Sequence, residues 1–160
     1  KAVFTGSFDP LTLGHIDIIN QGLKLFETII IGVGLNKEKK YMFDIDERKK
    51  FTKAIFKNKT QVVVKGYLGL TIDFCKKEKA NHIIRGIRNS TDFEYEKTIA
   101  LANYELDKNI ETIFLPAKKE HLFTSSTIAR EIILHKGSLT GQLNHFVPNT
   151  IIELINHEIS

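Results

Sequence analysis

Residues 6–15, with the sequence GSFDPLTLGH, bring together groups that can bind a phosphate. Gly6 allows a tight turn, and Ser7 offers both a hydroxyl and a main-chain N–H. Gly14 and His15 stand where a helical pattern begins, so free N–H groups and the positive end of a helix dipole would face an anion. The segment predicts a phosphate site. The alternative is an ordinary strand-to-helix turn whose histidine only caps the helix or faces solvent.

A second candidate is the segment TSSTIAR at residues 124–130, which opens another helical pattern. Hydroxyl side chains and exposed N–H groups at a helix N-terminus suit the phosphates of a nucleoside triphosphate. Taken alone, the segment favours an ordinary helix capped by serine or threonine. A second phosphate-binding pattern about a hundred residues from the first favours the phosphate interpretation.

A third candidate joins Arg85 and Arg88 across Gly86 and Ile87, at the end of an apolar run. Guanidinium groups are always charged and present forked donors, which suits a place where two anionic substrates meet. The alternative is a pair of surface ion pairs with the acidic residues of the following segment, 92–96.

The other reactive side chains carry weaker signals. Cys75 lies in a helical pattern without a nearby histidine, so we expect a small buried residue and not a nucleophile. The six histidines show no metal-ligand spacing, so we expect no metal site built from side chains. The lysine-rich stretches at residues 37–40 and 49–59 are typical of solvated surfaces.

Five short β-branched apolar runs supply the strands that would position these groups. They lack alternation, which predicts strands covered on both faces. The runs are residues 2–5, 28–33, 61–64, 82–85 and 112–115. Between them, apolar residues recur at helical spacing, as at Ile16, Ile19, Leu23 and Phe26, and again at Tyr95, Ile99, Ala102 and Leu106.

This order of elements predicts one α/β domain over residues 1–160. We expect a doubly wound, Rossmann-like, five-stranded parallel sheet with helices on both faces, and one further helix at the end. Ligands of such sheets bind beyond the carboxyl ends of the strands, near the point where strand order reverses. The three candidate segments all follow strands or begin helices, as that rule requires.

Local signals mark the helix ends. Asp44 with Glu47, and Thr91 with Glu94, predict capping boxes. The basic residues and glycine of 135–137 predict a helix end. Pro148 suits the first turn of a closing helix that runs to about residue 158.

Composition excludes several classes of protein. The 160 residues are 42% hydrophobic and 26% charged, which is ordinary for a globular chain and excludes disorder. The net charge of +4 suits anionic ligands such as phosphates, but the absence of Trp speaks against a nucleic-acid partner. No apolar run approaches the roughly 18 residues of a membrane helix, so we expect no membrane association. The single cysteine favours a reducing, cytoplasmic location.

The form T-x-G-H at residues 12–15 resembles the signature of the nucleotidylyltransferase superfamily, and residues 124–130 resemble its second signature. The P-loop and G-x-G-x-x-G fingerprints are absent from the first turn. Within the superfamily, residues 85–96 closely resemble the phosphopantetheine adenylyltransferase family. The similarity spans the whole chain and includes KKYMF at residues 39–43 and HFVP at residues 145–148.

The resemblance implies transfer of the adenylyl group of ATP to 4′-phosphopantetheine, which gives dephospho-coenzyme A and pyrophosphate. It implies catalytic roles for His15 at the α-phosphate, Lys39 at the acceptor phosphate and Arg88 at the outer phosphates. The residues implied to bind ATP are Ser7, Phe8, His15, Gly86, Ile87, Arg88, Glu96, His121, Leu122, Phe123, Thr124, Ser125, Ser126 and Thr127. Those implied to bind 4′-phosphopantetheine are Ser7, Lys39, Leu70, Thr71 and Arg85. Mg²⁺ bound with ATP, and assembly as a homohexamer, are implied as well.

The chain departs from the family pattern at a few positions. Ser7 replaces the commoner threonine, Leu13 stands where asparagine is frequent and Tyr41 where proline is frequent. Thr127 replaces a third serine, and His121 stands where an aromatic side chain is typical. Two alternatives stay open on the sequence alone. One is another small nucleotidylyltransferase, acting on nicotinamide mononucleotide or on a sugar or glycerol phosphate. The other is a noncatalytic nucleotide-binding domain.

Overall fold

The computed structural model describes residues 1–135 and 139–159 and contains the five predicted strands. The strands are β1 (Ala2–Gly6), β2 (Ile29–Leu35), β3 (Val62–Leu68), β4 (His82–Ile87) and β5 (Glu111–Pro116). The helices are α1 (Leu13–Gly22), α2 (Ile45–Phe56), α3 (Thr71–Glu78), α4 (Ser90–Leu106), α5 (Ser126–Leu134), α6 (Leu139–Gln142) and α7 (Asn149–Ile159). Two short 3₁₀ turns, η1 (Lys119–His121) and η2 (Leu143–His145), flank α5 and α6.

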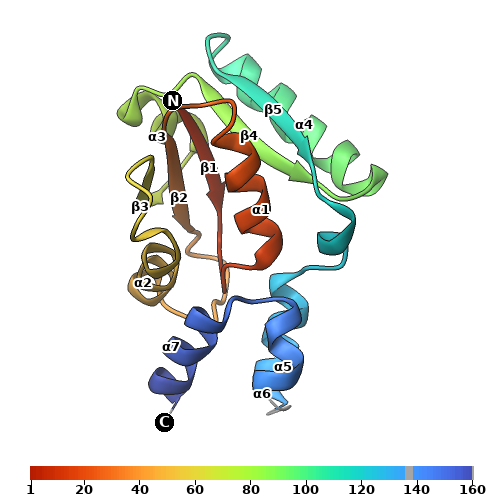
Figure 1. Cartoon of the computed structure of the whole chain (residues 1–160). Coiled ribbons are helices and arrows are strands. Elements are labelled where there is room, and N and C mark those ends of the chain that lie inside the picture. Colours follow the sequence, from red (N-terminus) through yellow and green to blue (C-terminus); the bar gives the residue numbers. More distant parts are fainter. Residues whose placement is uncertain (136–138, 160) are drawn as a thin grey trace.

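The strands form one parallel sheet in the order β3-β2-β1-β4-β5, which confirms the doubly wound α/β class (Figure 1). After β1 the chain builds outward through β2 and β3, and it then returns to the other side of β1 to place β4. Strand order therefore reverses between β1 and β4. Ligands bind at that point in sheets of this kind, because the connections on either side diverge and leave a crevice.

Two apolar cores lie on opposite faces of the sheet. Phe4 and Ile31 belong to the core that α1, α2, α5 and α7 cover. The neighbouring residues Val3 and Ile30 belong to the second core, which α3 covers. Successive strand residues point to opposite faces. Burial on both sides therefore explains why the runs that form β1 and β2 show no alternation of polar and apolar residues.

The edge strand β3 differs from this expectation. Its residues alternate between half-buried and exposed, and Val63 and Leu68 are exposed to solvent. The prediction that every strand is covered on both faces is therefore wrong for β3. An edge strand has a neighbour on one side only, and β-branched composition does not reveal where a strand lies in the sheet.

The helix ends follow the sequence signals in part. Asp44 and Glu47 form the predicted capping box of α2. The pair predicted at the start of α4 is wrong, because the cap is Asn89, whose side chain accepts the N–H of Asp92 at 2.9 Å. Pro148 lies just before α7 and not in its first turn. Its carbonyl accepts the N–H groups of Ile151 and Ile152 at 2.9 and 3.1 Å.

Helix α5 ends at Leu134 with His135 as its cap, as predicted, whereas residues 136 and 137 of that prediction lie outside the described residues. Within the described ranges, no helix is long and apolar enough to cross a membrane.

Candidate active site

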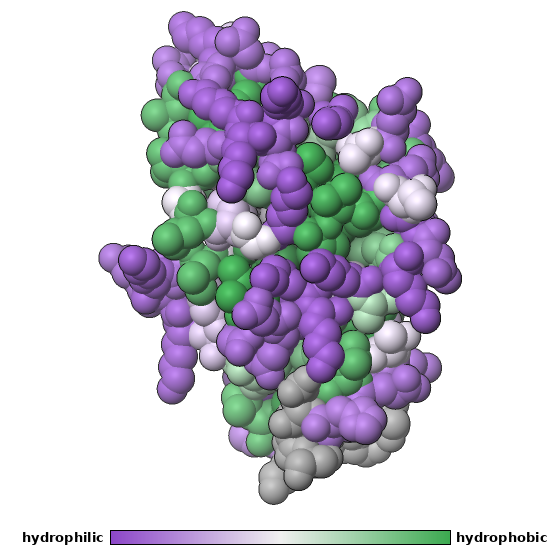
Figure 2. Space-filling model, turned by 90° about the vertical axis from the view of Figure 1, so that its left-hand side faces the viewer, coloured by the Kyte–Doolittle hydropathy of each residue, from purple (hydrophilic) through white to green (hydrophobic). Residues whose placement is uncertain are grey.

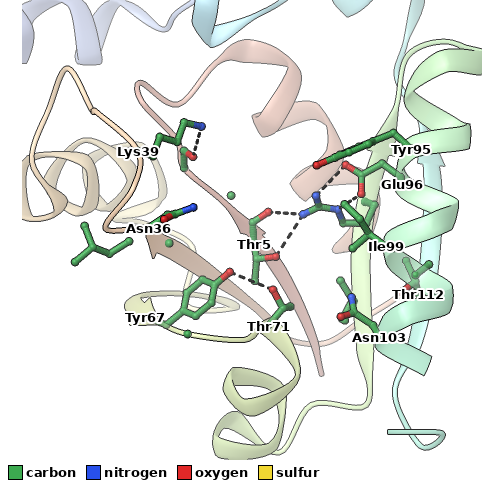
Figure 3. A pocket seen from close by; sticks show the side chains of 18 of the residues that line it. Thr5, Asn36, Lys39, Tyr67, Thr71, Tyr95, Glu96, Ile99, Asn103 and Thr112 are labelled. Atoms are coloured by element: carbon green, nitrogen blue, oxygen red, sulfur yellow. Dashed lines mark hydrogen bonds and ion pairs between the residues drawn. The ribbon is translucent and has the colours of Figure 1, made fainter. Parts of the chain in front are cut away.

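Two adjoining cavities open at the carboxyl ends of β1 and β4, at the point where strand order reverses. The cavity on the β2 side has a volume of about 400 Å³ and is walled by the ends of β1, β2 and β4 and by α4 (Figure 3). The cavity on the other side has a volume of about 330 Å³ and extends to α1 and the start of α5. We call them the β2-side cavity and the α5-side cavity.

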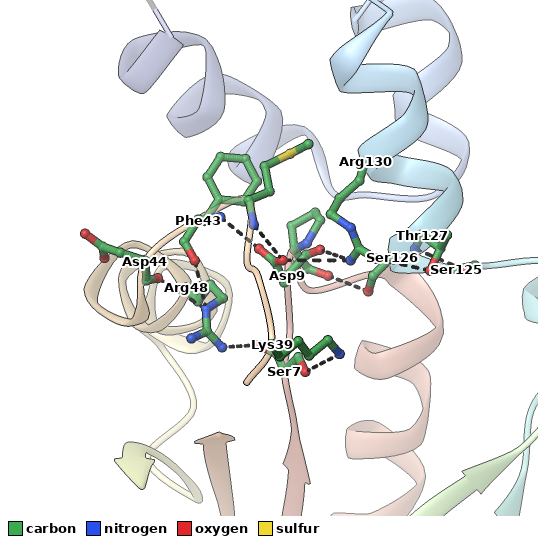
Figure 4. Close-up of polar contacts among 12 residues, drawn as sticks. Ser7, Asp9, Lys39, Phe43, Asp44, Arg48, Ser125, Ser126, Thr127 and Arg130 are labelled. Carbon is green, nitrogen blue, oxygen red and sulfur yellow. Dashed lines mark hydrogen bonds and ion pairs between the residues drawn. The ribbon is translucent and has the colours of Figure 1, made fainter. Parts of the chain in front are cut away.

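The two cavities share one polar wall, in which Lys39 and Arg85 are cationic and Glu96 is anionic. Its residues come from β1 and the turn after it, from the loop after β2, and from β4 and α4. They are Thr5, Gly6, Ser7, Lys39, Arg85 and Glu96. The Lys39 ammonium donates a hydrogen bond to Ser7 Oγ at 3.1 Å, within this wall (Figures 3 and 4). Ligands in the two cavities would therefore meet beside Ser7, Lys39 and Arg85.

His15 lines the α5-side cavity and also caps α1. Its Nδ1 accepts the main-chain N–H of Thr12 at 3.0 Å, and its own N–H donates to Thr12 Oγ1 at 3.4 Å. Because the N–H of Thr12 donates to Nδ1, that nitrogen carries no proton, and the neutral ring therefore has its proton on Nε2. The capping interpretation and the ligand interpretation of this histidine are therefore compatible, because capping uses Nδ1 and leaves Nε2 for a ligand.

The pKa of His15 is lowered from 6.5 to about 4. Burial of the ring is the main cause, and the positive charges of Arg88 and Arg85 add to it. The imidazole is therefore neutral at neutral pH and can donate a hydrogen bond from Nε2 without bringing a charge of its own. The fixed positive charge of the site comes from the arginines and Lys39.

The first turn and the start of α5 lie against each other, although more than a hundred residues separate them in sequence. Ser126 Oγ donates to the carbonyl of Pro10 at 2.9 Å, and Arg130 Nη1 donates to the carbonyl of Asp9 at 2.7 Å (Figure 4). Because Gly14 has no side chain, the first turn can approach Thr124 closely; a Cβ at Gly14 would lie 3.3 Å from the Cβ of Thr124. The two candidate phosphate-binding segments therefore form one surface.

Arg85 is held by a bidentate ion pair with Glu96, with Nε–Oε2 at 2.6 Å and Nη2–Oε1 at 2.8 Å. Its third nitrogen, Nη1, donates to the carbonyl of Thr5 at 2.8 Å. Arg88 pairs with Asp92 at 2.8 Å and donates to the carbonyl of Thr124 at 3.3 Å. The ion pairs that we considered as an alternative role are present, but both arginines also line the cavities. The pairs therefore orient the guanidinium groups within the site.

Most of the residues proposed from the sequence lie on the two cavities. The β2-side cavity has Ser7, Lys39, Thr71, Arg85 and Glu96 among its lining residues. The α5-side cavity has Ser7, Phe8, His15, Gly86, Arg88, Glu96, His121, Thr124, Ser125, Ser126 and Thr127. Four proposed residues are not among the lining residues of either cavity: Leu70, Ile87, Leu122 and Phe123. Of these, Phe123 is the most exposed, at 81%.

The structure also adds residues to which the sequence assigned no individual role. Arg130 lines the α5-side cavity and pairs with both Asp9 and Thr127. Its position four residues after Ser126, on the same helix face, was the signal that could have found it. Asn36 and Tyr67 line the β2-side cavity. Their chemistry is common in loops and strands, so only the fold reveals their place.

The described residues contain no group of three or more His, Cys, Asp or Glu side chains placed to hold a metal ion. Of the carboxylates that line the cavities, Glu96 is paired with Arg85 and Asp92 with Arg88. The pairing with Arg88 lowers the pKa of Asp92. These carboxylates therefore orient the arginine side chains.

Fold and site together define the class. A parallel sheet with two cavities at its switch point, a histidine at the first helix and a hydroxyl-rich helix start agree with what the resemblance of residues 12–15 and 124–130 to the nucleotidylyltransferase superfamily implies. The family model described as cytidylyltransferase-like matches residues 3–132. The structure is similar to that of a protein from Vibrio parahaemolyticus, provisionally assigned as a nicotinate-nucleotide adenylyltransferase, with a TM-score of 0.72, 19% identity and coverage of 96% of both chains. A nicotinic acid mononucleotide adenylyltransferase of Plasmodium falciparum has a TM-score of 0.67 at 17% identity, over 98% of this chain and 94% of that chain. These two likenesses concern the fold.

The curated relatives give the particular family. The phosphopantetheine adenylyltransferase of Flavobacterium johnsoniae is 53% identical over 86% of this chain and 90% of its own length. That of Flavobacterium psychrophilum is 55% identical over the same shares, and that of Lachnoclostridium phytofermentans is 42% identical over 96% of this chain and 91% of its own length. The chain therefore belongs to the phosphopantetheine adenylyltransferase family.

Proposed function

We propose that this chain transfers the adenylyl group of ATP to 4′-phosphopantetheine, giving dephospho-coenzyme A and pyrophosphate. The observation that carries the proposal is the wall of Ser7, Lys39 and Arg85 shared by two adjoining cavities. Such a wall suits a reaction that joins two phosphate-bearing substrates. The names of the relatives supply the chemical identity of the two substrates.

We assign ATP to the α5-side cavity, because the start of α5 presents hydroxyl groups and N–H groups there. The acceptor belongs in the β2-side cavity, with its phosphate against Lys39 and Ser7. A phosphate monoester is already an anionic nucleophile, so one of its oxygens attacks the α-phosphorus directly. The bond between the α-phosphorus and the oxygen that bridges to the β-phosphate breaks, and pyrophosphate leaves with that oxygen. The protein's part is to align the two substrates and to stabilise the negative charge that develops.

The side chains divide that work according to their charge. His15 donates from Nε2 to an oxygen of the α-phosphate, where charge appears in the transition state. Arg88 and Arg130 face the outer phosphates at the start of α5. Arg85 lies between the substrates, oriented by Glu96 and Thr5, and keeps at least one of its five N–H groups for a substrate phosphate.

We propose that Mg²⁺ enters with ATP, coordinated by its phosphates. Mg²⁺ is commonly held by substrate phosphates with few protein ligands. The pairing of Asp92 and Glu96 with arginines fits this arrangement. The ion would neutralise charge on the leaving pyrophosphate.

We also expect a cytoplasmic location. The single cysteine, Cys75, is free and buried, which is consistent with a reducing compartment.

We further propose that copies of the chain assemble as a homohexamer. No residue of α4 is buried within one copy, and Tyr95, Leu101 and Leu106 on it are exposed. On another side, apolar surface lies open between polar regions near β3, where Val63 and Leu68 are exposed (Figure 2). Exposed apolar patches of this kind favour contact with other copies. Analytical ultracentrifugation at several protein concentrations tests the proposal, and a monomer at all of them contradicts it.

A pyrophosphate-release assay with ATP and a panel of acceptors tests the activity. We expect release with 4′-phosphopantetheine, and little with nicotinamide mononucleotide or glycerol phosphate. Release with one of the other acceptors alone would replace the proposed substrate. Binding of ATP without release for any acceptor would support the noncatalytic alternative.

A further inference from the structure

The loop of residues 36–43, between β2 and α2, carries Lys39 into the site, although most of it is exposed. Residues 36–40 are all exposed to solvent. Short local bonds shape the loop: the N–H of Lys39 donates to the carbonyl of Asn36 at 3.1 Å, and the N–H of Glu38 donates to Asn36 Oδ1 at 2.9 Å. These bonds fold the loop upon itself, but they do not attach it to the rest of the protein.

The end of the loop is attached to the turn after β1, because the N–H groups of Met42 and Phe43 donate to the carboxylate of Asp9 at 2.9 and 3.0 Å. Tyr41 attaches the exposed part. Its hydroxyl accepts the main-chain N–H of Asn36 at 2.9 Å, so one side chain joins the two ends of the exposed segment. Its ring lies over the guanidinium of Arg48, with 4.0 Å between Arg48 Cζ and the ring centroid. A cation facing an aromatic ring at this distance is attracted by the ring's electron density. Tyr41 therefore fastens the loop to α2.

Arg48 connects this contact to the phosphate-binding turn. The side chain is fully buried, and Nη1 donates to the carbonyl of Ser7 at 2.6 Å (Figure 4). Nη1 also donates to the carbonyl of Gly34 at 2.9 Å. Nε donates to the carbonyl of Phe43 at 3.1 Å. Among the described residues Nη2 has no hydrogen-bond partner. The charge lies against the ring of Tyr41, these carbonyls and the carbonyl of Asp44, which accepts from Nε at 3.3 Å, and the carboxylates of Asp9 and Asp44 are near enough to interact with it. A buried guanidinium held in this way fixes three segments relative to one another.

The contacts form a closed circuit that begins and ends at Ser7. Lys39 Nζ donates to Ser7 Oγ, the loop leads from Lys39 to Asn36 and Tyr41, and Tyr41 covers Arg48, which holds the carbonyl of Ser7. We propose that Tyr41 is a positioning residue that sets the ammonium of Lys39 against Ser7 for the phosphate of the acceptor. This role rests on the proposed function, in which that phosphate lies at Lys39.

The physical reason is the flexibility of lysine. Its ammonium is a point charge on four rotatable bonds, so it is positioned only as well as the backbone that carries it. Loss of the Tyr41 hydroxyl removes the bond that closes the exposed segment. Loss of the ring also removes the contact with Arg48. The acceptor should lose affinity in both cases, whereas ATP, bound from α1 and α5, should be affected little.

Steady-state kinetics on Tyr41→Phe and Tyr41→Leu test the role, with each substrate varied in turn. Tyr41→Phe should raise the KM for 4′-phosphopantetheine roughly three- to tenfold, the equivalent of one hydrogen bond, with the KM for ATP unchanged. Tyr41→Leu should raise the KM for 4′-phosphopantetheine further, so the Phe variant should be less impaired than the Leu variant. Tyr104→Leu on α4 is the matched control, because Tyr104 lines neither cavity and should leave both KM values unchanged.

A double-mutant comparison separates positioning from folding. In a Lys39→Ala background, Tyr41→Phe should add less than about twofold to the acceptor KM, because the group that it positions is gone. A full effect in that background, an equal rise in both KM values, or no effect of Tyr41→Leu would each overturn the role. The activity of the wild-type protein in the same assay distinguishes failure of the proposed function from failure of the positioning role of Tyr41. Inactivity of the wild type refutes the proposed function, whereas an active wild type with unaffected Tyr41 variants refutes only the positioning.

Discussion

Replacement of His15 by asparagine or by glutamine tests the roles of its two ring nitrogens one at a time. In an asparagine, the amide can stand in for Nδ1 and accept the N–H of Thr12, but it has no group at the position of Nε2. In a glutamine, the amide reaches the position of Nε2 and loses the cap. If Nε2 donates to the α-phosphate in the transition state, His15→Asn should fold well and His15→Gln should retain activity.

The expected size of each effect follows from the structure. Loss of a preorganised donor to a developing oxyanion lowers kcat by about 10²–10³, or roughly 3–4 kcal/mol, which we expect for His15→Asn and His15→Ala. Loss of the cap costs about 1 kcal/mol of folding stability, which we expect for His15→Ala and His15→Gln. Initial rates and thermal unfolding of the three variants provide both numbers. Wild-type kcat in a folded His15→Asn would refute the role of Nε2.

The lowered pKa of His15 adds a dependence on pH. In the unfolded chain the ring binds a proton below 6.5, whereas in the folded protein it binds one only below about 4. Between these values the unfolded state holds more protons, so stability falls as pH falls from about 6.5 through about 4. His15→Gln should lack this component. A fall of kcat centred near pH 6.5 that disappears in His15→Gln would contradict a depressed pKa.

Three further predictions concern the remaining site and its packing. Lys39→Ala should raise the KM for 4′-phosphopantetheine, whereas Lys40→Ala, at an exposed position that lines neither cavity, should be nearly silent; equal defects in steady-state kinetics would mean that the wrong lysine is assigned. His121→Ala should raise the KM for ATP about tenfold if the ring stacks on adenine, and His121→Trp should restore it; an unchanged KM for ATP in the Ala variant would remove the stacking role. Gly86→Ala should lower the free energy of unfolding by about 1–3 kcal/mol, because the added Cβ would lie 2.8 Å from Cγ1 of the buried Ile18; an unchanged melting temperature would show that Ile18 can shift.

The central part of the fold could be predicted because its signals are local. Strands β1 and β2 lie between two cores, so their apolar character is continuous and easily recognised. Helix α4 was predicted from Tyr95, Ile99, Ala102 and Leu106, yet none of its residues is buried in the structure. Spacing reveals that a helix has an apolar face, but it does not reveal what covers that face.

The site likewise has a part that could be predicted from the sequence and a part that could not. The segments around His15, Arg88 and Ser126 could be located because each lies at a strand end or a helix start, where the backbone itself binds anions. Arg48 could not be found, because its partners are carbonyl groups of residues from three separate segments. Carbonyl groups exist at every position, so no side-chain pattern marks such a partner. Asn89 was missed for a related reason: several residues near it could cap a helix, and tertiary packing selects one.

The wall shared by the two cavities has a consequence for the end of the catalytic cycle. In the proposed function each substrate occupies one cavity, and the product of adenylyl transfer would join both halves in a single molecule that spans the shared wall at Ser7, Lys39 and Arg85. Once one half is seated, the other is held nearby at high effective concentration, so both halves must detach together before the product escapes. The architecture that aligns two polyanions for reaction therefore also retains what it has made, and departure of the product becomes a candidate for the slowest step of turnover.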